Sequence, residues 1–305
     1  MTIPPSPRLP VPPSRSICAI LCALVLVSST LLAGQPDAYP IQQDVVYGKA
    51  GGVELKLDLA VPPATAGDGP FPLLVLIHGG GWCGGTKLSY HNAIREYAKK
   101  NYVAATVEYR FAPKFKFPAQ VEDVKCAVRY LRAHAKELKI DPKKVAALGD
   151  SAGGHLSLML GLMDSKDGLE GDGGNPEQSS KVQAVINYYG PTDFTVGSAA
   201  WNPMVIGLVT NFLGTTDEKA PIVAQSSPIT YINAGDPPIL TFHGTADLIV
   251  PLDQAKRLHE ALKKAGVTER LEIIEKGGHG FRGPDFQRTF QISTEFLEQV
   301  FSEKK

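Results

Sequence analysis

The chain has 305 residues, 43% of them hydrophobic, which is enough to bury the core of one large α/β domain or of two small ones. Lysine and arginine together number 31, and aspartate and glutamate also number 31, so the formal net charge at pH 7 is zero. Because the sequence has neither a basic block nor an acidic tail, we expect no nucleic-acid partner.

The first 33 residues differ in composition from the rest. Residues 1–16 are rich in proline and carry Arg8 and Arg15 but no acidic residue, and residues 17–33 are almost wholly apolar. A basic region followed by an apolar region predicts a secretory signal peptide over residues 1–33. Residues 34–305 are then predicted to form a secreted or periplasmic catalytic domain, without stable membrane association after cleavage. The apolar stretch is also close to the shortest length that spans a bilayer, so an uncleaved anchor with an external catalytic domain is the alternative.

Four cysteines are present, and Cys18 and Cys22 lie in the predicted signal peptide. Cys83 and Cys126 remain, so one disulfide is possible in an oxidising compartment. Nothing in the sequence brings these two together, and we expect two buried free thiols. No C-x-x-C or H-E-x-x-H spacing occurs, so no metal site is expected.

After an initial hairpin, the apolar patterns predict alternating strands and helices. Residues 53–59 alternate strictly between apolar and polar side chains and predict a half-buried antiparallel hairpin with residues 41–47. Residues 71–77 are apolar throughout, as in a central strand covered on both faces. Further strands are predicted at residues 102–109, 144–148, 182–189, 238–243 and 271–275, and helices at residues 87–100, 119–138, 155–160, 252–265 and 286–301.

This alternation predicts a mostly parallel sheet with helices on both faces. Residues 194–233 are less regular and predict a small lid insertion of short helices above the sheet. No internal repeat or linker divides residues 34–305, which we therefore predict to be one domain.

A serine in a tight turn lies at the centre of this pattern. The sequence Gly149-x-Ser151-x-Gly153 follows the predicted strand 144–148 and precedes a predicted helix. A strand, a tight turn with a serine and a helix are typical of a nucleophile elbow, which holds the serine hydroxyl at the top of a sheet. Ser151 is therefore the predicted nucleophile.

A serine hydroxyl needs a base, and the chain has seven histidines. Sites in parallel sheets lie beyond the carboxyl ends of the strands, which leaves His243 and His279. We favour His279, because its glycine-flanked loop can fold the ring toward Ser151. Asp247 follows the strand 238–243 and is the predicted acid that orients the imidazole. The competing carboxylates are those of Asp236, Asp253 and Asp285.

A glycine-rich loop supplies candidate donors for an oxyanion. The sequence from His78 to Gly81 follows the predicted central strand, as an oxyanion loop of the His-Gly-Gly-Gly kind does. We assign the backbone N–H groups of Gly80 and Gly81, together with that of Ala152 at the start of the elbow helix, to a predicted oxyanion hole.

Together these motifs resemble the α/β-hydrolase fold of hormone-sensitive-lipase-like carboxylesterases, and they are similar to those of bifunctional acetylxylan/feruloyl esterases. The resemblance implies ester hydrolysis through an acyl-enzyme without a cofactor, with Ser151 as nucleophile, Asp247 as acid and His279 as base. It also implies Gly80, Gly81 and Ala152 as oxyanion donors. The motifs that carry it are His78–Trp82, Tyr109–Pro113, Phe117–Ala119, Gly149–Gly154, Gly190–Asp193, His243–Pro251 and Gly278–Phe281.

The chain departs from relatives that prefer long acyl chains, because residues 34–40 are too short for a helical N-terminal cap. We therefore expect a fairly open site and hydrolysis of short-chain esters, acetyl above all, on a small molecule or on polysaccharide, with feruloyl esters as a further candidate. A serine amidase, peptidase or formamidase is the alternative, and an inactive binding module is the third class. Trp82 and Phe281 are predicted to bind substrate through their aromatic faces. Five aromatic residues lie in or near the loops at the carboxyl ends of the strands, namely Trp82, Tyr109, Phe111, Trp201 and Phe281. We expect at least three of these five to pack in the core instead of binding substrate.

Overall fold

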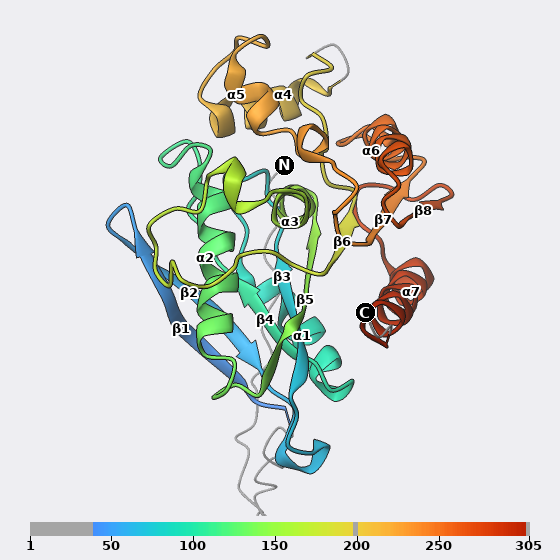
Figure 1. The fold of residues 1–305 in the computed structure, drawn as a ribbon. Helices are drawn as coiled ribbons and strands as arrows, with labels where there is room; N and C mark the ends of the chain where they lie inside the picture. Colours follow the sequence, from blue (N-terminus) through green and yellow to red (C-terminus); the bar gives the residue numbers. More distant parts are fainter. Residues whose placement is uncertain (1–38, 198–200, 303–305) are drawn as a thin grey trace, which may run out of the picture. The chain divides into compact units, whose positions relative to one another are not determined.

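The computed structural model describes residues 39–197 and 201–302 (Figure 1), so the predicted signal peptide and its cleavage lie outside the described residues. The described chain forms one eight-stranded sheet with the strand order β1-β2-β4-β3-β5-β6-β7-β8. The strands are β1 Ile41–Ala50, β2 Val53–Ala60, β3 Phe71–Ile77, β4 Val103–Val107, β5 Ile140–Asp150, β6 Ala184–Tyr188, β7 Ile239–Gly244 and β8 Glu269–Ile274. The α-helices are α1 His91–Lys99, α2 Ala119–Ala133, α3 Ala152–Leu162, α4 Pro203–Leu213, α5 Pro221–Gln225, α6 Leu252–Ala265 and α7 Gly283–Ser302. Short 3₁₀ helices are η1 Ala64–Ala66, η2 Lys87–Tyr90, η3 Ser165–Asp167 and η5 Pro228–Tyr231.

The sheet is antiparallel at its N-terminal edge and parallel elsewhere. Strand β1 pairs with β2, and β2 with β4, in antiparallel register, whereas all pairs from β4 across β3 to β8 are parallel. The predicted fold class, a mostly parallel sheet with an N-terminal antiparallel hairpin, is confirmed. Because the carboxyl ends of parallel strands meet at one edge, the loops that follow β3, β5, β7 and β8 come together there.

Helices cover both faces of the sheet. They must do so because successive side chains of the apolar central strand point to opposite faces. In β3, Leu73 and Val75 pack into the core beneath α2 and α3, whereas Leu74 and Leu76 pack into the core beneath α1 and α7 (Figure 1). Helix α3 is buried along its whole length, because it lies directly on the strands at the middle of the sheet. The elbow serine therefore lies between the buried end of β5 and the fully buried helix α3.

Some boundaries differ from prediction. The predicted helix 87–100 begins as the 3₁₀ turn η2, and the predicted helix 119–138 ends at Ala133. The lid segment, residues 194–233, contains α4, α5 and η5 (Figure 1), with residues 198–200 outside the described part. Cys83 and Cys126 are both free thiols, as expected, but Cys83 is half-buried rather than buried. Within residues 39–197 and 201–302, no helix is long and apolar enough to cross a membrane.

A buried lysine fixes the segment that leaves the glycine loop. Lys87 opens η2 and is 4% exposed. Its Nζ atom lies 3.0 Å from a carboxylate oxygen of Asp44, 3.0 Å from one of Asp58 and 3.7 Å from one of Glu108. Asp58 is fully buried and also contacts Nε2 of His91 at 2.6 Å. The cluster therefore joins η2 and α1 to β1, β2 and the end of β4.

Removal of the Lys87 ammonium should destabilise the protein strongly. Lys87→Met leaves the Asp58 carboxylate buried without its lysine partner, which typically costs about 3–5 kcal/mol. The control is Lys166→Met, because Lys166 is largely exposed in its pair with Asp164 and such pairs contribute about 0–1 kcal/mol. Denaturant unfolding of both variants measures the difference, and equal losses of unfolding free energy would contradict the structural role of the cluster.

Candidate active site

The strand-to-helix turn after β5 holds Ser151 in a backbone conformation that is rare for a residue with a side chain, with φ 52° and ψ −120°. Two glycines make this turn possible. A Cβ atom on Gly149 would clash with the carbonyl of Gly153, and one on Gly153 would clash with the carbonyl of Ile77 in β3. The backbone N–H of Ser151 donates to the carbonyl of Tyr188 at 2.9 Å, which ties the turn to β6. These contacts are those of a nucleophile elbow.

The structure brings Ser151, His279 and Asp247 together. Nε2 of His279 lies 2.9 Å from Oγ of Ser151, and Nδ1 lies 2.8 Å from Oδ2 of Asp247. With a neutral imidazole, the serine hydroxyl donates to Nε2 and the Nδ1–H group donates to the carboxylate. The Asp247 side chain is fully buried, whereas the His279 side chain is 19% exposed. The imidazole thus faces the solvent side of the site, whereas the carboxylate is shielded from water.

The loop after β7 holds the Asp247 carboxylate in its ionised form. The backbone N–H groups of Ile249 and Val250 donate to Oδ1 at 2.8 and 2.9 Å. Burial raises the pKa of Asp247, but the hydrogen bond and charge of His279, together with these two N–H groups, bring the pKa below its ordinary value. The carboxylate is therefore available to orient the imidazole and to balance a positive charge on it.

The competing candidates lie elsewhere. His243 is fully buried, and its Nε2–H group donates to the carbonyl of Val250 at 2.8 Å and lies 3.5 Å from Oδ2 of Asp247, whereas the histidine that contacts Ser151 is His279. Asp236 accepts hydrogen bonds from Asn233, and Asp253 pairs with Arg257. Among the described residues, the carboxylate that contacts His279 is that of Asp247.

The glycine loop after β3 packs directly against the elbow. Its backbone turns through φ 119° at Gly80 and φ 58° at Gly81, both of which favour glycine. The Gly79 N–H group donates to Oδ1 of Asp150 at 3.0 Å, and the Tyr90 hydroxyl donates to the same oxygen at 2.7 Å. Asp150 directly precedes Ser151, so one carboxylate joins the loop to the elbow.

These placements fit the predicted oxyanion donors. Ala152 is the first residue of α3, where a backbone N–H group has no partner within the helix. Gly80 and Gly81 follow Gly79, whose position against the elbow is so close that a Cβ atom there would lie 3.2 Å from Cβ of Ser151. The assignment of Gly80, Gly81 and Ala152 to an oxyanion hole remains a prediction.

The prediction that Trp82 binds substrate is wrong. Trp82 is 2% exposed, its ring stacks on that of Phe212 in α4 with centroids 4.3 Å apart, and its indole N–H group donates to Nδ1 of His155 at 3.2 Å. The sequence placed Trp82 beside the glycine loop but did not show that the lid covers it. Tyr109 and Trp201 are also buried, so three of the five candidate aromatic residues are core, as expected.

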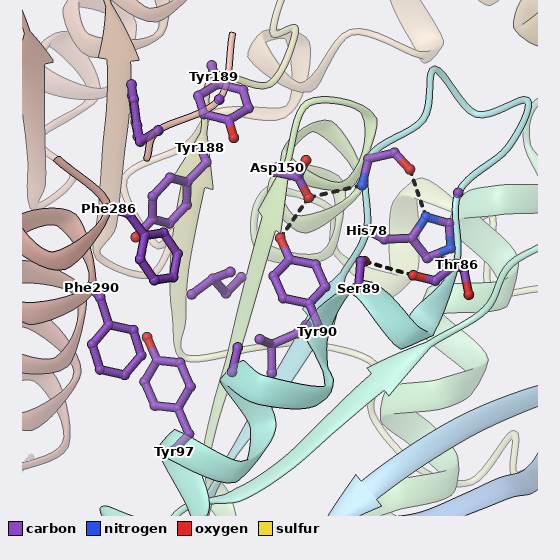
Figure 2. Close-up of a pocket in the computed structure, with 17 residues that line it drawn as sticks. His78, Thr86, Ser89, Tyr90, Tyr97, Asp150, Tyr188, Tyr189, Phe286 and Phe290 are labelled. Carbon is purple, nitrogen blue, oxygen red and sulfur yellow. Dashed lines mark hydrogen bonds between the residues drawn. The ribbon is translucent and has the colours of Figure 1, made fainter. Parts of the chain in front are cut away.

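Phe281 is half-buried and lines an apolar pocket next to the triad. Figure 2 shows this pocket. This aromatic pocket has a volume of about 430 Å³. Its walls come from the glycine loop, α1, the ends of β5 and β6, the loop after His279 and the start of α7. The role of Phe281 in substrate binding remains a prediction, but its position is compatible with one.

Sequence reasoning missed two supporting side chains. Asp150 holds Gly79, and its position directly before Ser151 was the available signal. His155, one helical turn after the nucleophile, accepts from Trp82 and donates from Nε2 to the carbonyl of Ser226 in the lid at 2.8 Å. Burial lowers the pKa of His155 to about 4, so the ring is neutral at neutral pH. Its Nδ1 atom can therefore accept the hydrogen bond from the indole N–H group of Trp82.

The neutral His155 predicts a loss of stability in mild acid. The unfolded chain binds the proton near pH 6.5 and the folded chain only near pH 4, so unfolding becomes easier as the pH falls through this window. The full loss is about 3 kcal/mol, because each pH unit of difference corresponds to about 1.4 kcal/mol. Urea unfolding between pH 7 and pH 4 should show a smaller decrease for His155→Gln than for wild type or for the control His134→Gln. Parallel curves for all three proteins would refute the assignment.

Comparison with known proteins places this chain in a family. The family model BD-FAE matches residues 57–262. Among curated relatives, the probable carboxylic ester hydrolase LipM of Mycobacterium tuberculosis is 31% identical over 229 residues, which cover 74% of this chain and 52% of LipM. Esterase LipC of the same organism is 30% identical over 225 residues, which cover 72% of this chain and 55% of LipC. The chain thus spans about half the length of these curated relatives.

Solved structures of esterases share the fold. A truncated carbohydrate esterase from gut microbiota superimposes with a TM-score of 0.77 at 25% identity, over 88% of this chain and 99% of that one. Esterase 2 of Thermogutta terrifontis phosphonylated by sarin superimposes with a TM-score of 0.76 at 30% identity, over 87% of this chain and 96% of that one. The chain belongs to the BD-FAE family of α/β-hydrolase esterases.

Proposed function

We propose that the protein is a serine carboxylesterase that hydrolyses short-chain carboxylic esters through an acyl-enzyme. The observation that carries this proposal is the unbroken hydrogen-bond chain from Ser151 through His279 to Asp247 at the elbow. The family membership and the esterase names of the relatives support the same reaction class.

The geometry accounts for each step of this reaction. Oγ of Ser151 attacks the ester carbonyl carbon while Nε2 of His279 takes its proton, and Asp247 stabilises the resulting imidazolium. Negative charge develops on the carbonyl oxygen, where the N–H groups of Gly80, Gly81 and Ala152 would bind it. His279 then returns the proton to the departing alcohol oxygen. A water molecule attacks the acyl-enzyme in the same way and releases the acid.

The lid supports a preference for short acyl groups. A Cβ atom on Gly81 would lie 2.7 Å from Cδ1 of Leu208, so helix α4 closes down on the predicted oxyanion donors. An acyl chain that extends toward Gly81 would meet the side chain of Leu208 instead of an open apolar channel. Each methylene stabilises the complex by about 0.8 kcal/mol only where it is buried, so longer chains gain little here.

The proposed substrates are acetyl or feruloyl esters on polysaccharide. The enzyme that hydrolyses them is proposed to be exported. The apolar N-terminal segment supports export, which would place the enzyme where large polymers are degraded. The similarity to a carbohydrate esterase from gut microbiota supports carbohydrate esters. Amide substrates are the alternative, because the same three residues can cleave amides.

The three hydrogen-bonded residues should act as a unit. Ser151→Ala should remove turnover, and Asp247→Asn should lower kcat by about 10⁴-fold, because the imidazole then loses its correct tautomer. The double variant should be little worse than Ser151→Ala alone. Initial rates on p-nitrophenyl acetate measure this, and circular dichroism checks the fold. A folded Ser151→Ala protein with a tenth of the wild-type rate would exclude Ser151 as nucleophile.

The acyl preference can be measured with a series of p-nitrophenyl acetate, butyrate and octanoate. We expect kcat/KM to fall by at least about tenfold from acetate to octanoate, and Leu208→Ala to reduce this difference because it opens the side of Gly81. The control is Met204→Ala, an exposed residue of the same helix. A wild-type preference for octanoate would overturn the proposal.

Acetate release from acetylated xylan and ferulate release from a feruloylated glycan test the polysaccharide assignment. Peptide and formamide substrates in the same assay test the amide alternative. If simple esters react and neither glycan does, the proposal reduces to a general carboxylesterase.

A further inference from the structure

We propose that the aromatic pocket beside the triad is the subsite for the leaving alcohol, and that among alcohols of equal shape it favours those that carry an organic ammonium group. The assignment to the alcohol rests on the proposed esterase function, whereas the affinity for an ammonium group follows from the pocket itself. Four observations carry it: the place of the pocket, its aromatic walls, its single carboxylate and the neutrality of its other polar groups.

The pocket lies on the imidazole side of the nucleophile. Gly280 and Phe281, which line it, directly follow His279 in the chain, and the ring of Tyr189 lies 4.7 Å from the imidazole between centroids. Because His279 delivers a proton to the departing alcohol oxygen, the alcohol must leave on this side. At Gly81, Leu208 of the lid leaves less room, because a Cβ atom on Gly81 would lie 2.7 Å from Cδ1 of Leu208.

Aromatic side chains enclose the pocket from opposite elements. Figure 2 shows Tyr188 and Phe286 facing Tyr90 across the open space, with Tyr97 and Phe290 at one end. At about 430 Å³, the pocket is in the size range of ligand sites. Several aromatic rings around one space are the arrangement that binds quaternary ammonium groups through the negative faces of the rings.

One carboxylate faces this aromatic enclosure. Asp150 is the sole acidic residue among those that line the pocket, and no lysine or arginine lines it. Within the part of the chain that the structure describes, Asp150 forms no ion pair; its Oδ1 atom accepts from uncharged donors, the N–H of Gly79 and the hydroxyl of Tyr90. Hydrogen bonds from neutral groups leave the negative charge in place, so the pocket attracts a cation and repels an anion.

The remaining polar groups of the wall are uncharged at neutral pH. Burial, together with the nearby Asp150 carboxylate, raises the pKa of Tyr90 well above its usual range, so its hydroxyl stays protonated. Burial lowers the pKa of His78, although its hydrogen bond to the Gly79 carbonyl and the charge of Asp150 act in the opposite direction. A neutral His78 does not compensate Asp150. The pocket therefore has the apolar walls and the single negative charge that fit an alkylammonium group.

Two acetate esters of equal shape separate the effect of a positive charge on the alcohol from the effect of its size. In 2-(trimethylammonio)ethyl acetate the alcohol carries a positive charge, and in 3,3-dimethylbutyl acetate a carbon atom replaces the nitrogen. At low ionic strength we expect kcat/KM to be at least about tenfold higher for the cationic ester, which corresponds to about 1.4 kcal/mol. A ratio near one, or a ratio below one, would overturn the proposal.

Substitutions in the pocket test whether it causes the difference in kcat/KM between the two esters. Asp150→Asn should bring the ratio of the two kcat/KM values close to one, whatever its effect on the absolute rates, because the amide oxygen can still accept from Gly79 and Tyr90. Phe286→Leu should lower the ratio in part. The control Asp285→Asn removes an exposed carboxylate next to Phe286 in sequence and should leave the ratio unchanged. If Asp150→Asn lowers both rates equally and keeps the ratio, Asp150 merely positions Gly79 and the proposal fails.

Binding to the inactive enzyme separates this proposal from the proposed function. Calorimetry with Ser151→Ala should show that choline binds at least about tenfold more tightly than 3,3-dimethylbutanol, and that adding Asp150→Asn removes the difference. If neither ester is hydrolysed but choline binding depends on Asp150, the esterase assignment fails and the ammonium site stands. If the esters are hydrolysed but choline does not bind more tightly than its neutral analogue, the ammonium site fails and the esterase assignment stands.

Discussion

The close approach of helix α3 to strand β3 is the constraint on which the rest of the site depends. Gly153 lies so close to the carbonyl of Ile77 that no side chain fits between them, and Gly149 is equally close to Gly153. This contact forces the chain to reverse within a few residues and leaves Ser151 at φ 52°. The strained serine is thus held by backbone packing against buried strands, together with the hydrogen bond from its N–H group to the carbonyl of Tyr188.

Everything else in the site is positioned relative to this fixed point. The glycine loop follows β3 directly, so the strand that constrains the elbow also delivers Gly80 and Gly81 to it. Asp150 and Ser151 are consecutive, and the carboxylate of the first holds Gly79 beside the second. The two loops that carry Asp247 and His279 are in turn packed together at Gly244, where a Cβ atom would clash with the carbonyl of Gly277.

The sequence predicted the parts of this arrangement that depend on local patterns. The apolar run at Phe71–Ile77 gave the central strand, and the glycines around Ser151 gave the elbow, because period and turn chemistry are local properties. Asp247 and His279 were predicted from their positions after predicted strands, together with the glycines around His279 and the chain order. The burial of Trp82 was not predictable, since it depends on Phe212 of the lid, which is 130 positions away in the chain. Contacts at such separation leave no periodic signal in a single sequence.

Asp150 shows why catalysis and selectivity are difficult to separate in this fold. The carboxylate that holds Gly79 next to Ser151 is the same carboxylate that gives the aromatic pocket its charge. A glutamate would move the oxygen atoms by one methylene and displace the loop, and an apolar residue would leave the N–H of Gly79 without its partner. The charge of the pocket is therefore a consequence of how the glycine loop is held. Selectivity for the alcohol can be tuned more freely at Phe286, which is 53% exposed and lies outside the hydrogen-bond network of the elbow.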